Sequence, residues 1–121
     1  MKSEGRRILV VDDDPEIAAM LGRSLTRHGF QTDTTSSPNE ALVLARQAAY
    51  DAAVVDLVMP EQNGVHLASA LRVVTPGLPV AILTGYTRSP LLEDAEGPGL
   101  RVFAKPVAIQ DVVDFIEAEL A

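Results

Sequence analysis

Three short apolar runs, rich in β-branched side chains, constrain the fold of this chain more than any other feature. They span residues 8–11, 52–55 and 80–83. Consecutive residues in each run are apolar, so both faces of the extended chain are hydrophobic. This pattern is typical of strands in a parallel sheet that is covered on both faces. Residues 30–35 alternate more and predict an edge strand, and residues 100–104 predict a fifth strand.

Segments with helical periodicity separate the apolar runs. Asp14-Pro15 and Ser37-Pro38 each place an N-cap residue before a Pro suited to the first helical position, and Asn63-Gly64 begins a third helix. Gly29 ends the first helix. Each helix has an apolar face at the spacing that predicts burial against a sheet. The positions on these faces are Ile17, Met20, Leu21 and Leu25; Leu42 and Ala45; Val65, Leu67, Ala68 and Leu71; and Ile109, Val112, Val113, Ile116 and Leu120.

A weaker helical segment precedes the fifth predicted strand. Because Pro90 fits only the first turn of a helix and Gly97-Pro98-Gly99 breaks helices, we expect a short helix over residues 90–95. Five strands alternating with five helices predict an α/β fold with a doubly wound, five-stranded parallel sheet and helices on both faces. The flavodoxin-like order 2-1-3-4-5 suits five strands. A length of 121 residues predicts a single domain over residues 1–121, with no output domain in this chain.

The composition argues against some classes of partner. Ten basic against seventeen acidic residues give a net charge of −7, which argues against direct binding of nucleic acid because phosphate binding depends on Lys and Arg. No apolar run approaches the ~18 residues of a membrane span. The chain has no Cys, and therefore neither a disulfide framework nor a thiolate metal site. We expect a cytoplasmic protein that does not contact a membrane.

The residues that follow the strands carry the chemistry. Asp12 and Asp13 follow the first strand, Asp56 the third, Thr84 the fourth and Lys105 the fifth. In an open parallel sheet these positions share one edge, and ligands bind at the switch in strand order, here between the first and third strands. The three aspartates are therefore expected to lie close together. The neighbouring Asp14 is interpreted as a helix N-cap.

Several carboxylates in one cleft repel one another and need a counter-charge. A hard divalent cation such as Mg²⁺ is held by one or two carboxylates and leaves its other positions to water and phosphate oxygens. Lys105 adds a compact positive charge suited to phosphate, and the Thr84 hydroxyl can donate to a phosphate oxygen. A carboxylate nucleophile beside a metal, a Lys and a hydroxyl makes an aspartyl-phosphate site.

These motifs, in this order, resemble the receiver (CheY-like) domain of bacterial two-component response regulators. The resemblance covers about residues 7–120. Its motifs are Val10-Val11-Asp12-Asp13, Asp56-Leu57-Val58-Met59-Pro60 followed by Asn63-Gly64, Leu83-Thr84-Gly85, and Lys105-Pro106. Each motif is weak by itself, but together, each at a strand end, they are specific.

The resemblance implies a role for each matching residue. It makes Asp56 the phosphoacceptor, and Asp12 and Asp13 the acid pair that holds Mg²⁺ (or Mn²⁺) together with Asp56 and the backbone carbonyl of Val58. Thr84 matches the hydroxyl that moves towards the phosphoryl group. Lys105 matches the Lys that pairs with it, and the Lys105–Pro106 peptide bond is implied to be cis.

The sequence also departs from the family pattern. The family places an aromatic switch residue three positions before the Lys, where this chain has Val102. Phe103 comes one residue later and, by strand alternation, points to the opposite face, which favours a core role. Val58, Gly85 and Tyr86 match positions that border the phosphoryl group. An apolar residue and a large ring there predict slow hydrolysis of the phosphoaspartate.

The expected function is a phosphorylation-dependent switch. A histidine kinase or a phosphotransfer protein would supply the phosphoryl group, and the altered surface would change affinity for a downstream protein. We expect a monomer or weak homodimer that assists its own phosphorylation and dephosphorylation but does not turn over an external substrate. Two alternatives remain open. One is a receiver-like interaction module that is never phosphorylated. The other is an aspartyl-phosphate hydrolase of the haloacid dehalogenase type, whose two aspartates have the spacing of Asp12 and Asp14.

Overall fold

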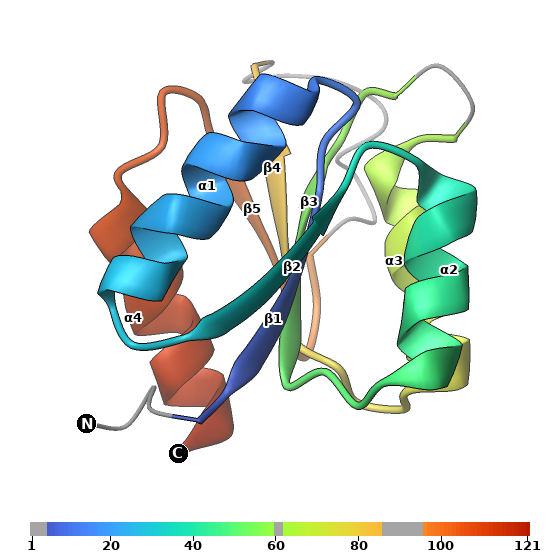
Figure 1. Ribbon diagram of the computed structural model, residues 1–121. Helices are drawn as coiled ribbons and strands as arrows, with labels where there is room; N and C mark the ends of the chain where they lie inside the picture. The colour runs from blue at the N-terminus through green and yellow to red at the C-terminus, as the bar shows by residue number, and fades with distance from the viewer. Residues whose placement is uncertain (1–4, 60–61, 86–95) are drawn as a thin grey trace.

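The computed structural model describes residues 5–59, 62–85 and 96–121 (Figure 1). Its single sheet has five strands in the order β2-β1-β3-β4-β5, and all neighbouring strands are parallel. This confirms the predicted fold class and strand order. The described elements are β1 (Arg7–Val11), α1 (Pro15–Arg27), β2 (Gln31–Thr35), α2 (Pro38–Gln47), β3 (Ala52–Asp56), α3 (Gly64–Val74), β4 (Val80–Thr84), β5 (Leu100–Ala104) and α4 (Ile109–Leu120). The helix expected over residues 90–95 lies outside the described residues.

Helices cover both faces of the sheet. Figure 1 shows α1 and α4 on one face and α2 and α3 on the other. Alternate residues of the central strands enter two separate apolar clusters. Leu9, Val55 and Ile82 pack on the α2–α3 side, whereas Val10 and Val54 pack on the α1–α4 side. The continuous apolar runs are explained by this arrangement, because each strand has a buried side chain on both faces.

The helix starts follow the predicted capping chemistry. The side chain of Asp14 accepts a hydrogen bond from the Glu16 amide, and that of Ser37 accepts one from the Glu40 amide. At α3, the Asn63 side chain accepts from the His66 amide at 2.9 Å. These bonds satisfy amides that the first turn of a helix otherwise leaves unpaired.

In the described part of the chain, no helix is both long and apolar enough to cross a membrane.

The prediction that Met20 faces the core is wrong. Its side chain is 52% exposed. Helix α1 contacts the sheet through Ala18, Leu21, Gly22 and Leu25, which centre its buried face towards β2. At Gly22 the two elements approach so closely that an added Cβ would lie 2.8 Å from the Thr34 methyl carbon. Met20 is therefore left at the rim of the contact, because the sequence period does not say how far a helix is rotated about its axis.

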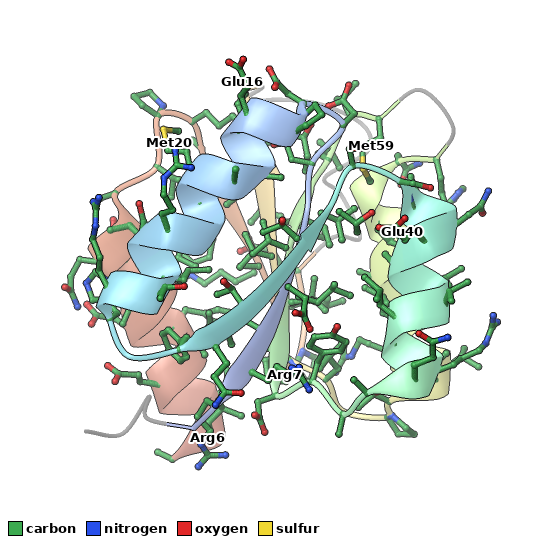
Figure 2. All side chains as sticks on the ribbon, in the orientation of Figure 1. Arg6, Arg7, Glu16, Met20, Glu40 and Met59 are labelled. Carbon is green, nitrogen blue, oxygen red and sulfur yellow. The ribbon has the colours of Figure 1, made fainter. Side chains whose placement is uncertain are left out.

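The amino-terminal end of the sheet carries a polar network. The Tyr50 hydroxyl donates to Asp33 Oδ2 at 2.7 Å, and Arg7 Nε lies 3.2 Å from the same oxygen. The Arg7 amide donates to Asp51 Oδ2 at 2.8 Å. Burial, and then the bond to Asp33, raise the pKa of Tyr50 to about 12. Figure 2 shows Arg6 and Arg7 at this end of the molecule, with Glu16 and Met59 at the other.

Gly64 allows the first turn of α3 to lie directly against the end of β3. Its amide donates to the Leu57 carbonyl at 2.7 Å. An added Cβ would overlap the Asp56 carbonyl oxygen and would lie 3.0 Å from Leu57 Cα. Both neighbours are backbone atoms, which cannot move away as the end of a flexible side chain can. The position therefore requires a residue without a Cβ.

We expect Gly64→Ala to lower the free energy of unfolding by about 1–3 kcal/mol, the usual cost of forcing extra atoms into a packed site. Urea denaturation followed by circular dichroism measures the change. Gly97→Ala is the matched control, because no atom of the described residues lies within 4 Å of its added Cβ. The control should leave stability unchanged or raise it by up to about 1 kcal/mol. Equal effects of the two substitutions would contradict the assigned contact.

Candidate functional site

The carboxyl edge of the sheet gathers the charged residues that the sequence singled out. Asp12 directly follows β1, and Asp56 is the last residue of β3. Thr84 is the last residue of β4, and Lys105 directly follows β5. Asp12, Asp13 and Asp56 each offer a carboxylate oxygen, and these three oxygens lie within 4.8 Å of one another. Their convergence follows from the strand order, which places β1 beside β3.

Lys105 supplies positive charge to this cluster. Its Nζ donates to Asp56 Oδ1 at 3.0 Å and lies 3.9 Å from Asp12 Oδ2. The Lys105 amide donates to the Thr84 carbonyl at 2.7 Å, which fixes the residue at the end of the β4–β5 ladder. The Lys105–Pro106 peptide bond is cis, the geometry that the resemblance implies.

Asp12 and Asp56 are buried, with exposed fractions of 1% and 8%. Burial is the largest cause that raises the pKa of each carboxyl group. For Asp12, the bond that Oδ1 accepts from the Asp14 amide at 2.9 Å opposes the rise. For Asp56, the contact with Lys105 opposes it. Asp12 Oδ2 is buried and has no hydrogen-bond partner in the described part of the chain.

The donor set fits a hard divalent cation. Within the described residues, three carboxylates face one Lys, so two negative charges remain uncompensated when all of these groups are ionised. The unpartnered Asp12 oxygen provides a second, independent indication, since a buried polar atom without a partner is costly. Carboxylate oxygens are the ligands that Mg²⁺ and Mn²⁺ prefer. The cluster can therefore hold such an ion.

Four further residues that the sequence singled out are Asp14, Val58, Gly85 and Tyr86. Asp14 caps α1 and is exposed, so it is engaged outside the carboxylate cluster. Val58 lies two residues beyond Asp56, and its side chain is 46% exposed. Gly85 follows Thr84, and no atom of the described residues lies within 4 Å of a Cβ added to it. Tyr86 lies outside the described residues.

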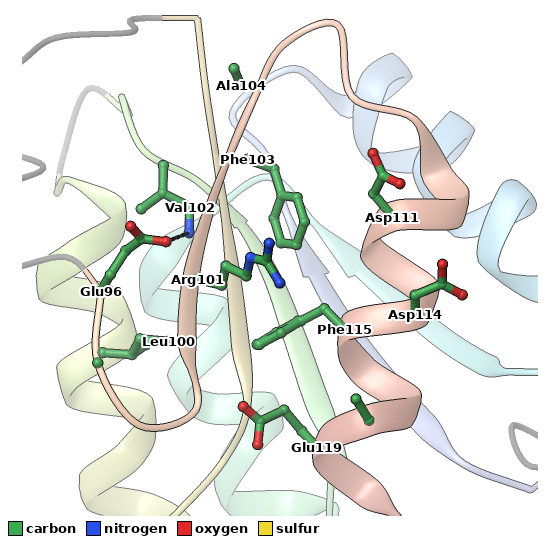
Figure 3. A pocket seen from close by; sticks show the side chains of 12 residues that line it. Glu96, Leu100, Arg101, Val102, Phe103, Ala104, Asp111, Asp114, Phe115 and Glu119 are labelled. Carbon is green, nitrogen blue, oxygen red and sulfur yellow. Dashed lines mark hydrogen bonds between the residues drawn. The ribbon is translucent and has the colours of Figure 1, made fainter.

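Val102 and Phe103 point to opposite faces of β5, as strand alternation predicts (Figure 3). Val102 packs against the apolar cluster on the α2–α3 side. Phe103 packs on the α4 side, where its ring meets Phe115 edge-on with centroids 5.8 Å apart. Arg101 lies over the Phe103 ring at 5.5 Å. Phe103 is thus partly buried against the core of the α1–α4 side, and Val102, where the resemblance places the switch aromatic, packs on the opposite face.

Sequence reasoning missed two features of the site. It placed Gly64 at the start of a helix but did not predict that the glycine brings α3 against the backbone of Asp56 itself. The only signal was an Asn-Gly pair soon after the third strand. It also gave no indication that one Asp12 oxygen would be paired with a backbone amide and the other left without a partner, because this depends on the conformation of the turn after β1.

Asp12→Asn should stabilise the protein at neutral pH when divalent cations are removed. Because the pKa of Asp12 is raised above its ordinary value of 3.8, the folded chain binds this proton more tightly than the unfolded chain. The resulting stabilisation is complete below pH 3.8 and is lost as the pH rises through the folded pKa. The amide never ionises, so the variant should exceed the wild type at pH 7 and the difference should shrink on acidification.

Urea unfolding in EDTA, from neutral pH downwards, measures this difference. Exposed Glu119→Gln is the control and should change stability by less than about 0.5 kcal/mol. Added Mg²⁺ should favour the wild type, since only its carboxylate gains a cation. A variant less stable than the wild type at pH 7 in EDTA would mean that Lys105 and the Asp14 amide already compensate the charge.

Comparison with known proteins places this arrangement in a family. Residues 8–117 match the model of the response regulator receiver domain. A response regulator receiver protein of Anaeromyxobacter sp. is 36% identical over 110 residues, which are 90% of this chain and 46% of that protein. The receiver protein CpdR of Brucella abortus is 28% identical, over 95% of this chain and 97% of its own length. The transcriptional regulatory protein GlrR of Escherichia coli is 35% identical, but the match spans 24% of its length.

Solved structures agree with this result. A receiver domain protein from Clostridium thermocellum superposes with a TM-score of 0.84 at 27% identity, covering 95% of this chain and 94% of that one. A Burkholderia pseudomallei response regulator, described with a phosphorylated aspartic acid, a calcium ion and citrate, has a TM-score of 0.84 at 27% identity over 95% and 68% of the two chains. The chain therefore belongs to the response regulator receiver domain family.

Proposed function

We propose that this receiver domain is a phosphorylation-dependent switch whose phosphoacceptor is Asp56. One observation carries the proposal. The Asp56 carboxylate lies at the switch in strand order, in contact with Lys105 at 3.0 Å and within reach of the carboxylates of Asp12 and Asp13. A phosphoryl group attached to Asp56 would lie near the Lys105 ammonium group and near the Asp12–Asp13 pair, which can bind a metal ion. The phosphodonor is a histidine kinase or a phosphotransfer protein in the cytoplasm.

The transfer is an in-line displacement at phosphorus. A carboxylate oxygen of Asp56 forms the new O–P bond while the N–P bond of a phosphohistidine breaks, and the electron pair of that bond stays on the imidazole nitrogen. Lys105 neutralises charge on the phosphoryl oxygens, and the Thr84 hydroxyl donates to one of them. Asp12, Asp13, Asp56 and the Val58 carbonyl would hold the divalent cation, which when bound neutralises the remaining phosphoryl charge. Attack by water on the phosphoaspartate reverses the modification.

The added phosphoryl group carries about −1.5 to −2 charges near neutral pH, by analogy with other phosphorylated side chains. Such a charge biases an equilibrium between two packings of the chain, and the altered surface changes affinity for a downstream protein. In this mechanism the domain catalyses changes of its own phosphorylation state and has no external substrate. The acid pair of a haloacid dehalogenase-like hydrolase is disfavoured here, because Asp14 is used as the cap of α1.

We expect incubation with acetyl phosphate and Mg²⁺ to add one phosphoryl group to the wild type, as measured by intact mass. Asp56→Ala should gain none, because the attacking oxygen is absent. Asp111→Ala should be modified like the wild type, since Asp111 is an exposed carboxylate outside the cluster. Omission of Mg²⁺ should abolish the adduct.

Three results would contradict this assignment. An adduct that persists in Asp56→Ala would place the acceptor elsewhere. A complete lack of adduct, with no binding of beryllofluoride to the folded wild type, would favour the interaction module that is never phosphorylated. Hydrolysis of small phosphate esters with turnover would favour the hydrolase.

The exposed Val58 side chain should slow hydrolysis of the phosphoaspartate, because an apolar group beside Asp56 neither binds nor orients water. We expect Val58→Asn to shorten the half-life of the phosphorylated protein several-fold. The loss of the mass adduct after removal of acetyl phosphate measures it. Met20→Asn, at another exposed apolar position, is the control and should leave the half-life unchanged. Equal half-lives of the Val58 variant and the wild type would remove this role.

A further inference from the structure

A basic groove lies between α1 and the free edge of β2, apart from the carboxylate site. It has a volume of about 390 Å³ and is lined by Arg23, Arg27, Thr26, Thr32 and Thr34, together with Ala19 and Gly22. No carboxylate belongs to this lining. In a chain whose net charge is −7, the groove is a local reversal of sign.

The side chains of Arg23 and Arg27 have no ion pair or hydrogen bond in the part of the chain that the structure describes. Both are exposed, and they are four residues apart on α1, so they share one side of the helix. Arg6 and Arg7, by contrast, contact Asp51 and Asp33. The two guanidinium groups of the groove are therefore available to an anionic ligand.

The groove also exposes the backbone of an edge strand. Within the described residues β2 pairs only with β1. The Gln31 amide donates to the Arg6 carbonyl, and the Thr35 carbonyl accepts from the Asp12 amide. The backbone groups of alternate residues in a strand point to opposite sides. The amides and carbonyls of Thr32 and Thr34 therefore point away from β1, outside the sheet. Residues 31–35 contain neither Pro nor Lys, two devices that commonly block pairing at an edge.

Side-chain contacts on both faces hold the edge strand β2 rigidly, in a form with which a further strand can pair. The Thr32 hydroxyl donates to the Gly22 carbonyl at 3.4 Å and lies 3.1 Å from the Thr26 hydroxyl. The Thr34 methyl group packs at Gly22. On the other face of β2, Asp33 is fixed by Tyr50 and Arg7. A preformed edge loses little conformational entropy when a further strand is added.

We propose that this α1–β2 groove binds an extended acidic segment of a partner protein, which adds to the sheet beside β2. The outward amides and carbonyls of Thr32 and Thr34 supply the backbone hydrogen bonds. Arg23 and Arg27 bind carboxylates on the side of the segment that faces α1. Residues four apart on a helix are separated by about 6 Å along its axis. Residues two apart on a strand are separated by about 6.6–6.8 Å.

The segment that fits therefore carries two acidic residues separated by one residue. Main-chain pairing supplies much of the affinity in this mode of recognition, and side chains supply the selection. The groove runs along the edge of the sheet, whereas Asp56 lies at the carboxyl end of β3. Docking is independent of Asp56, and the proposal does not rest on phosphorylation.

The test uses the whole unphosphorylated chain and a capped peptide in which glutamate alternates with valine. Binding is followed by the amide resonances of the ¹⁵N-labelled protein. We expect saturable shifts centred on Thr32 and Thr34, and slower exchange of both amide protons. The Arg23→Glu/Arg27→Glu variant should bind at least tenfold more weakly. Arg46→Glu, which reverses an exposed charge on α2, is the matched control and should bind as the wild type does.

Two further peptides separate charge from strand pairing. A lysine–valine peptide should not bind, and the glutamate peptide with alternate backbone nitrogens methylated should lose most of its affinity. The proposal is overturned if the lysine peptide binds equally, if methylation has no effect, or if Arg46→Glu weakens binding as much as the double variant. It is also overturned if the protein alone dimerises and the double variant does not, because the groove would then hold a second copy. A spectrum that is otherwise unchanged shows that each variant is folded.

Discussion

The contact between Lys105 and Asp56 is the interaction on which the rest of the site depends. Lys105 follows the edge strand β5, yet its Nζ lies 3.0 Å from a carboxylate at the end of β3, one strand further than its own neighbour β4. This reach requires β3, β4 and β5 to end in register, which their pairing provides. Among the described residues one Lys faces three carboxylates, an excess of negative charge that a divalent cation can neutralise. The strand order thus brings the three aspartates together, and the register of β3, β4 and β5 brings the Lys105 ammonium group to them.

The two faces and the two edges of the sheet have separate roles. Both faces are buried under helices and supply the stability that supports a cluster of like charges. At one edge, the outward amide of Val102 is met by the carboxylate of Glu96 at 3.3 Å. At the other edge, the outward groups of Thr32 and Thr34 have no equivalent partner within the described residues. Within the described residues, the outward amides of Thr32 and Thr34 therefore lack the hydrogen-bond partner that the Val102 amide has at the β5 edge.

Much of the fold could be predicted from the sequence, because the order of apolar and polar residues determines which positions of a strand or helix are buried. Continuous apolar runs such as residues 8–11 require helices on both faces, and the position of Asp56 after such a run fixes the end of the sheet at which it lies. What could not be predicted depends on how elements are placed against one another. Met20 was assigned to the core because the period of a helix gives a face but not its rotation. The contact of Gly64 with the Asp56 backbone, and the pairing of Arg7 with Asp33, arise only when distant segments meet.

The polar network at the amino-terminal end of the sheet has a consequence for the dynamics of the whole domain. There hydrogen bonds and contacts between opposite charges join Arg7, Asp33, Tyr50 and Asp51, whereas the carboxyl end holds three carboxylates close together. Local opening is cheapest where fewest favourable interactions are lost, and like charges held together favour separation, so we expect opening to begin at the charged end. A ligand that binds at the charged end therefore contacts the part of the domain that opens most easily. A small difference in its affinity for two conformations can then shift the equilibrium between them.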